Sequence, residues 1–149
     1  MDAAWPVSDG EAIHTSTFLG HPVGCAMALA EMEEIEQGKL VEKSAATGDY
    51  LLGLLKELAQ AGVSRLELEA RGLGLLAGIE LRAGRGRLAT RMVLETIKRM
   101  LHRGYILLPE GDQAQVISFS PPLTISRAQL AETVRVLGGT LREAARSVK

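Results

Sequence analysis

Two stretches in the first half of the chain repeat hydrophobic residues at the spacing of an α-helix. Residues 23–37 combine alanine, methionine, leucine and isoleucine on one side with glutamates on the remaining faces; Pro22 stands at the first helical position and Gly38 follows the last. Residues 43–61 carry a stripe of leucines and end before Gly62. Both patterns are typical of amphipathic helices, and we predict a helix over each stretch.

Two further stretches show the same period. Residues 88–101 place leucine, methionine and isoleucine on one face and stop shortly before Gly104. Ser126 and Gln129 stand three residues apart, as in a capping box, where each side chain bonds the other residue's backbone N–H. Residues 130–141 then continue with leucine and valine on one face. We therefore predict a third helix and a last helix.

Strand patterns lie between these helices. Residues 66–70 alternate leucine and glutamate, which predicts a half-buried strand, and the denser apolar run 73–81 predicts a more buried one. Residues 71–72 between them predict a turn, so the two strands should pair antiparallel. Residues 105–108 and 116–119 predict two more short strands. The sum is an α+β fold in which helices pack on one small, mainly antiparallel sheet.

Composition and charge exclude several classes of function. The chain has 149 residues, 46% hydrophobic and 23% charged, with a formal net charge of −1, as in an ordinary globular domain. A net charge this close to zero does not favour binding to nucleic acid or to an anionic membrane. No apolar run is long enough to cross a bilayer. No signal-peptide pattern opens the chain, and the single cysteine, Cys25, fits a reducing compartment. We expect a cytoplasmic protein.

The glycines at positions 72, 74 and 78 superficially resemble a dinucleotide-binding loop. That fingerprint requires a strand, the glycine turn and then a helix, because the pyrophosphate lies at the helix N-terminus. Here the glycines lead into residues 75–81, which are predicted to form a strand. We predict a tight turn with a close backbone contact instead.

Residues 1–21 mix small polar residues with isolated apolar ones, as loops do. Within them, His14 is followed by three hydroxyl residues, Thr15, Ser16 and Thr17. Hydroxyls and backbone N–H groups beside a helix start can cradle a phosphate, but they also serve as ordinary turn and cap residues. No carboxylate stands where it could orient His14 for nucleophilic catalysis.

Metal binding is not indicated. His14, His21, His102 and Cys25 show no spacing typical of metal ligands. His21 lies in a Gly-His-Pro turn and His102 on the polar side of a helix, so both are predicted to be solvated. We predict no metal site.

Three blocks of the sequence, in a fixed order, point to a known family. Residues 14–30, HTSTFLGHPVGCAMALA, are similar to the signature that follows the catalytic lysine in class III (omega-aminotransferase) pyridoxal-phosphate-dependent aminotransferases. Residues 71–75 resemble the family's Arg-Gly-x-Gly-Leu block, and residues 120–125 its Pro-Pro-Leu segment before the last helix. The resemblance runs over nearly the whole chain and identifies it as a C-terminal fragment of such an enzyme.

The resemblance implies a fold, a cofactor and partners. Residues 41–149 would be the small C-terminal domain of a fold type I enzyme, and residues 1–40 a remnant of the large domain with the cofactor-phosphate loop and the connecting helix. The cofactor would be pyridoxal 5′-phosphate, with Thr17 donating its hydroxyl to the phosphate bound by the neighbouring subunit and Ser16 as an auxiliary donor. The complete enzyme would be a homodimer with active sites at the subunit interface.

The chain departs from the family pattern at the positions of the catalytic and substrate-binding residues. The Schiff-base lysine and the acidic partner of the pyridine nitrogen would precede Met1, which aligns with interior family sequence and indicates a missing N-terminal portion. None of the chain's own lysines stands in the matching context, so we predict no catalytic residue. His21 replaces the asparagine of Gly-Asn-Pro, and Ser118 stands where some members have an arginine for the substrate carboxylate.

The enzyme that the chain resembles exchanges an amino group between an amine or amino acid and a 2-oxo acid. The fragment alone should be inactive, because the lysine that forms the covalent link is absent. Two other interpretations stay open on the sequence. One is a stand-alone α+β interaction or small-ligand-binding module, and the other is an aminomutase or decarboxylase on the same scaffold.

Overall fold

The computed structural model describes residues 20–63, 66–82 and 86–147. The chain divides after Gly38 into two compact units. Among the described residues, the first unit contains one helix, α1 (Pro22–Gln37), and the second contains three helices and four strands.

Helix α1 begins at a proline with a histidine cap. Pro22 is the first helical residue, and His21 before it has an extended backbone. The Nδ1 atom of His21 accepts a hydrogen bond from the Gly24 N–H at 3.3 Å. After the last helical residue, the Gly38 N–H bonds the Glu34 carbonyl at 2.9 Å. The start and end predicted for this helix are confirmed.

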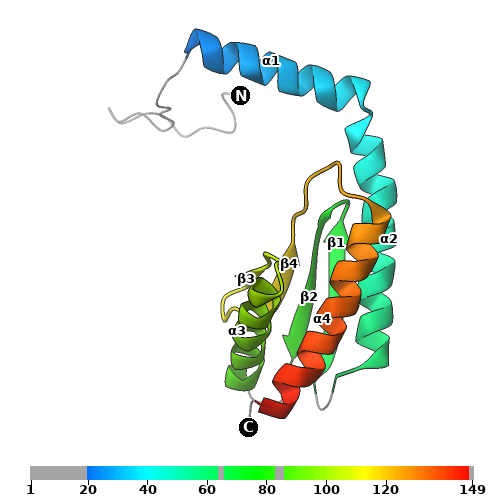
Figure 1. The fold of residues 1–149 in the computed structure, drawn as a ribbon, viewed down its shortest axis with the longest axis vertical. Coiled ribbons are helices and arrows are strands. Elements are labelled where there is room, and N and C mark those ends of the chain that lie inside the picture. The colour runs from blue at the N-terminus through cyan, green and yellow to red at the C-terminus, as the bar shows by residue number, and fades with distance from the viewer. Residues whose placement is uncertain (1–19, 64–65, 83–85, 148–149) are drawn as a thin grey trace, which may run out of the picture. The chain divides into compact units, whose positions relative to one another are not determined.

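The second unit is a layer of helices on an antiparallel sheet (Figure 1). In chain order its elements are α2 Leu40–Ala61, β1 Glu67–Leu73, β2 Leu76–Arg82, α3 Gly86–His102, β3 Leu108–Glu110, β4 Val116–Phe119 and α4 Arg127–Ser147. The strand order is β1-β2-β4-β3, and every neighbouring pair is antiparallel. The predicted α+β fold, with helices on a small antiparallel sheet, is confirmed.

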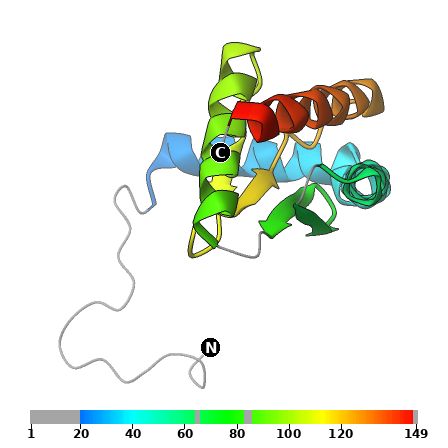
Figure 2. The same ribbon diagram turned by 90° about the horizontal axis from the view of Figure 1, so that it is seen from below.

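The three helices of this unit cover one face of the sheet, here named the covered face (Figure 2). Alternation along the strands turns Ile79 of β2 and Ile117 of β4 toward them, and both side chains are fully buried. Leu51 and Leu55 of α2 and Leu137 of α4 complete the centre of the core. Helix α4 lies between α2 and α3 and contacts both. Among the described elements of this unit, none packs on the opposite face, here named the open face.

The hairpin of β1 and β2 turns later than predicted. The sequence predicts the turn at residues 71–72, but β1 continues past them and the turn consists of Gly74 and Leu75. Gly74 has a φ of +56°, which glycine adopts readily and which a two-residue hairpin turn requires. Gly72 lies inside the strand opposite Ala77, where a Cβ would be 2.7 Å from the Ala77 Cα. The predicted tight turn with a close backbone contact is confirmed, three residues further along.

Strand β3 also begins later than predicted. The pattern predicts a strand over residues 105–108, whereas pairing with β4 starts only at Leu108. Gly104 has a φ of +85°, and the Tyr105 N–H bonds the Met100 carbonyl at 3.0 Å. Residues 104 and 105 therefore form the C-terminal cap of α3, and the chain joins the sheet only after them. The fourth strand, predicted at residues 116–119, is confirmed.

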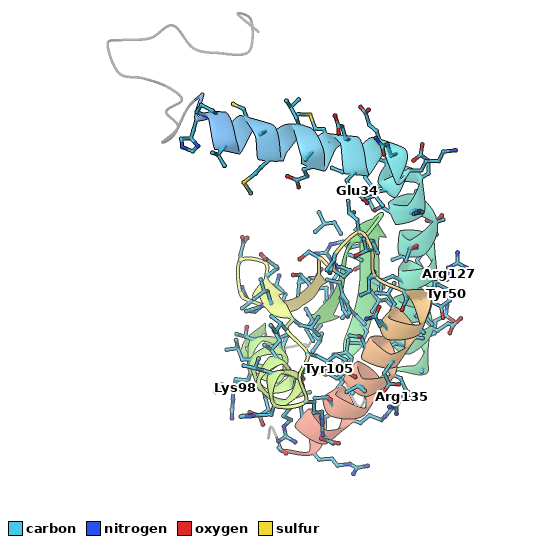
Figure 3. All side chains as sticks on the ribbon, turned by 45° about the horizontal axis from the view of Figure 1, so that its top comes forward. Glu34, Tyr50, Lys98, Tyr105, Arg127 and Arg135 are labelled. Atoms are coloured by element: carbon cyan, nitrogen blue, oxygen red, sulfur yellow. The ribbon has the colours of Figure 1, made fainter. Side chains whose placement is uncertain are left out.

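The start of α4 is fixed by its predicted capping box. The Gln129 N–H donates to Ser126 Oγ at 3.2 Å, and the Ser126 N–H donates to Gln129 Oε1 at 3.0 Å. Arg127 also links this end to α2, because its guanidinium lies 5.2 Å from the centre of the Tyr50 ring (Figure 3). The end of the loop that follows β4 is thus fixed by contacts with both α4 and α2.

Helix α2 lies against the hairpin turn with almost no side chain between them. Ser44 Oγ accepts a hydrogen bond from the Leu75 N–H at 3.3 Å. One turn further along α2, Gly48 is buried, and a Cβ on it would lie 2.1 Å from the carbonyl carbon and oxygen of Gly74. The contact between helix and turn therefore requires glycine at position 48.

We expect Gly48→Ala to destabilise the second unit by about 1–3 kcal/mol, because the added methyl group meets backbone atoms that cannot rotate away. Gly53→Ala is a matched control in the same helix, since nothing lies within 4 Å of its Cβ position. That change should be neutral or stabilise by up to about 1 kcal/mol. Urea unfolding of both variants measures the difference. Equal effects would show that the turn does not restrict position 48.

Candidate functional site

The residues predicted to contact the cofactor lie outside the described part of the chain. Thr17 and Ser16, like the neighbouring His14, precede residue 20. Their roles stay predictions. The candidate site that can be described is built from other residues, all on the second unit.

His21, predicted to be solvated, is exposed but has a structural role. Its imidazole caps α1 by accepting the Gly24 N–H. An asparagine, which the family pattern has at this position, caps helices in the same way. The signal was present in the sequence, since a polar residue directly before a proline at the first helical position is a cap pattern.

The described residues do not fit pyridoxal phosphate by themselves. A Schiff-base lysine is activated by burial or by a nearby charge, but the described lysines are all exposed, on or beside α2 and α3: Lys39, Lys43, Lys56 and Lys98. Figure 3 shows Lys98 on the outer side of α3. Within the described ranges, no group of three histidine, cysteine, aspartate or glutamate residues could hold a metal ion, and no helix is long and apolar enough to span a membrane.

A hollow of the second unit lies where β3 and β4 separate. The two strands pair as far as Leu108 and Ser118. Beyond these residues the segments 104–107 and 119–122 line a cavity of about 390 Å³, here named the β3–β4 wedge. Side chains from the loop before α4 and from its first turns complete the lining: Ile125, Leu130 and Thr133.

The lining of the wedge is uncharged. Three of its lining residues are buried and apolar: Leu107, Phe119 and Leu130. Its polar side chains belong to Tyr105, Ser118, Ser120 and Thr133, which all carry hydroxyls. The Thr133 hydroxyl donates to the Gln129 carbonyl at 2.8 Å, which leaves its oxygen lone pairs as acceptors. The arrangement suits an apolar molecule with few hydrogen-bonding groups.

The open face of the sheet carries a network of ion pairs on β1 and β2. Arg71 of β1 bonds Glu80 of β2, and Arg82 contacts both Glu80 at 3.4 Å and Glu69 at 2.6 Å. The hydrogen bond from Arg71 holds the pKa of the Glu80 carboxyl below its usual value, against the opposing effect of burial. Two positive and two negative groups thus neutralise each other on this face.

Ser118 stands between these two regions. It lines the wedge, and it also lines a second, shallower hollow of about 340 Å³ over Gly78 on the open face, with Arg71 at the far side. Strand pairing sets Ser118 directly opposite Gly78 on β2 and Leu108 on β3. The sequence marked Ser118 as a departure from the family, but only the sheet register shows that it joins the two hollows.

A family model described as "Aminotransferase class-III" matches residues 1–141 of the chain. Among curated relatives, the putrescine aminotransferase of Pectobacterium atrosepticum is 34% identical over 131 residues, which are 88% of this chain and 26% of that protein. The 5-aminovalerate aminotransferase of Pseudomonas aeruginosa is 35% identical over 147 residues, which are 97% of this chain and 33% of that protein.

A solved structure, a transaminase from the marine bacterium Virgibacillus, superposes with a TM-score of 0.80 at 26% identity. The superposition covers 94% of this chain and 32% of that one. The chain therefore spans about a quarter to a third of the length of the proteins that it matches.

Proposed function

This chain belongs to the class III aminotransferase family, and we propose that it forms the C-terminal portion of an enzyme that transfers an amino group between an amine or amino acid and a 2-oxo acid. The observation that carries the proposal is the family match over residues 1–141 by a chain that spans only part of its relatives. The relatives described above are aminotransferases, which favours this reaction over an aminomutase or a decarboxylase on the same scaffold.

The proposed cofactor is pyridoxal 5′-phosphate, held mainly by parts of the enzyme that the described residues do not contain. Thr17, assisted by Ser16, is the proposed contact of this chain with the cofactor phosphate. Residues 1–40 are the proposed remnant of the large domain, and residues 41–149 the proposed small domain.

We also propose a homodimer, and α1 is the described element that supports it. Four of its larger apolar side chains are each more than half exposed: Val23, Met27, Leu29 and Met32. An exposed apolar set of this kind on one helix is typical of a surface that another protein or domain covers. The partners proposed for it are a second subunit and the large domain.

The chain mixed with pyridoxal phosphate should show no stoichiometric aldimine and no transamination. The physical reason is that each described lysine is exposed to water, so none is held against a cofactor. Borohydride reduction followed by peptide mapping tests the first point, and an amino-transfer assay with several amines tests the second. Trapping of one lysine in stoichiometric yield would contradict this expectation.

A second experiment supplies the N-terminal portion of the enzyme and tests for a gain of activity. Co-expression with the N-terminal two-thirds of a class III aminotransferase should yield a complex that binds the cofactor and transfers amino groups. The same N-terminal part without this chain is the control, and it should be inactive. If co-expression yields a soluble complex that still does not transaminate, the proposed reaction is wrong.

A further inference from the structure

We propose that a hollow over Gly139, between α4 and the segment that follows α3, binds a small zwitterion whose ammonium and carboxylate groups are several carbons apart, as in an ω-amino acid. The hollow is here named the Gly139 notch. It lies among the helices of the second unit, on the other side of the sheet from the open face. The inference follows from its lining and charges and does not depend on the function proposed above.

Gly139 leaves a gap between two charged side chains of α4. Arg135 precedes it by about one helical turn and Glu143 follows it by about one turn, so both flank the same part of the helix surface. Nothing lies within 4 Å of the position that a Cβ of Gly139 would take. Arg103 and Tyr105 line the same hollow, and Figure 3 shows Tyr105 between α3 and α4. Its volume of about 310 Å³ is within the usual range for small ligands.

The charged groups on one side of the notch are held in place before any ligand arrives. Arg103 donates from Nη1 to Thr140 Oγ1 and from Nη2 to Glu143 Oε2, the latter at 2.6 Å. The Thr140 side chain is buried, and its hydroxyl donates in turn to the Val136 carbonyl at 2.8 Å. The buried threonine therefore orients Arg103, and Arg103 orients Glu143. Groups that are already ordered cost little entropy when they bind a ligand.

The notch offers one acceptor and one donor of opposite charge. Among the described residues, Glu143 Oε2 accepts from Arg103, whereas Glu143 Oε1 has no hydrogen-bond donor and can accept one from an ammonium group. Arg135 donates from Nε and Nη2 to Glu132 at 2.7 and 2.6 Å, and its Nη1 atom remains for a carboxylate. The hydrogen bond from Arg103 lowers the pKa of the Glu143 carboxyl, which keeps it ionised at neutral pH.

The charges of this cluster balance, which favours a zwitterion over a simple ion. Arg103 and Arg135 carry two positive charges, and Glu132 and Glu143 carry two negative ones. An anion alone would gain the Arg135 donor but would be repelled by Glu143. A cation alone would gain Glu143 but would be repelled by the two guanidinium groups. Only a ligand that carries both signs satisfies both groups.

The positions of the two groups select the length of the ligand. Arg135 and Glu143 are eight residues apart on α4, so their Cα atoms are about 12 Å apart along the helix axis. An α-amino acid carries both charges on one carbon and cannot reach both side chains together. A chain of several methylene groups can reach both, and its apolar middle would lie over Gly139 and Val136, which line the notch between them.

Amide chemical-shift titration of the whole chain tests this inference with 5-aminopentanoate and its two halves, pentylamine and pentanoate. The zwitterion should shift the amides of residues 103–105 and 135–143 and saturate. Each half should bind at least about tenfold more weakly, because it loses one hydrogen bond between charged groups. Free glycine, whose charges are adjacent, should also bind at least about tenfold more weakly.

Two substitutions remove one charge each from the notch. Arg135→Gln should lower the affinity for 5-aminopentanoate to about that for pentylamine, and Glu143→Gln should lower it to about that for pentanoate. Arg142→Gln is the matched control, since Arg142 is an exposed arginine of the same helix that does not line the notch. It should leave the affinity unchanged.

The comparison of the four ligands in the parent chain does not require any variant to fold. Equal affinity for 5-aminopentanoate and either of its halves, or the absence of saturable shifts at the notch, would overturn the proposal. So would an unchanged affinity in a folded Arg135→Gln chain. Because binding is measured without the N-terminal portion of the enzyme, a negative result would leave the proposed aminotransferase function untouched.

Discussion

Leu137→Ala should lower the free energy of unfolding by about 2–5 kcal/mol, the usual loss for a buried leucine. Leu137 lies at the middle of α4 and is 0% exposed. Because α4 contacts both α2 and α3, a cavity there removes contacts from all three helices. Urea unfolding followed by circular dichroism measures the change.

Leu54→Ala is the matched comparison, since Leu54 also lies on a helix against the core but is only half-buried. Its loss should be clearly smaller, because part of the side chain contacts water in the folded protein. The sequence alone treats the two leucines as equivalent members of apolar stripes. If both variants unfold at the same denaturant concentration as the parent, the helix faces are assigned wrongly.

Thr17→Val should weaken binding of pyridoxal phosphate about tenfold to a hundredfold once the N-terminal portion of the enzyme is supplied. The reason is the loss of the proposed hydrogen bond from the Thr17 hydroxyl to a charged phosphate, a bond worth about 1.5–3 kcal/mol. Equilibrium titration of the apo complex with the cofactor measures the change. In the isolated chain the substitution should have no effect on stability or on cofactor binding.

Thr17→Ser is the control for this prediction, because it keeps the hydroxyl and should lose much less affinity. The pair of variants separates hydrogen bonding from packing at this position. Unchanged cofactor affinity in the Thr17→Val complex would show that the residue does not have the role that the family resemblance implies.

Periodicity along the chain was enough to predict the elements of the fold. The stripe of leucines in α2, the capping box at Ser126 and Gln129 and the alternation before Gly74 are local patterns, and the helices and the hairpin follow them. The two regions where strand bounds were predicted wrongly, the hairpin turn and the start of β3, have one cause. At Gly72 and at Gly104-Tyr105, the residues are compatible with either a strand or a turn, and contacts distant in the sequence decide between them.

Local patterning thus determined the number, type and order of the helices and strands, and the ordered blocks determined the family, because both depend on residues close together in the chain. Only the tertiary structure decided which distant residues each of them contacts. Position 48 requires a glycine only because the hairpin turn at Gly74, 26 residues further along the chain, packs against it. Ser118 joins two hollows only because the sheet register places it between β2 and β3. Neither contact leaves a periodic trace in the sequence, since each is set by the packing of segments that are far apart in it.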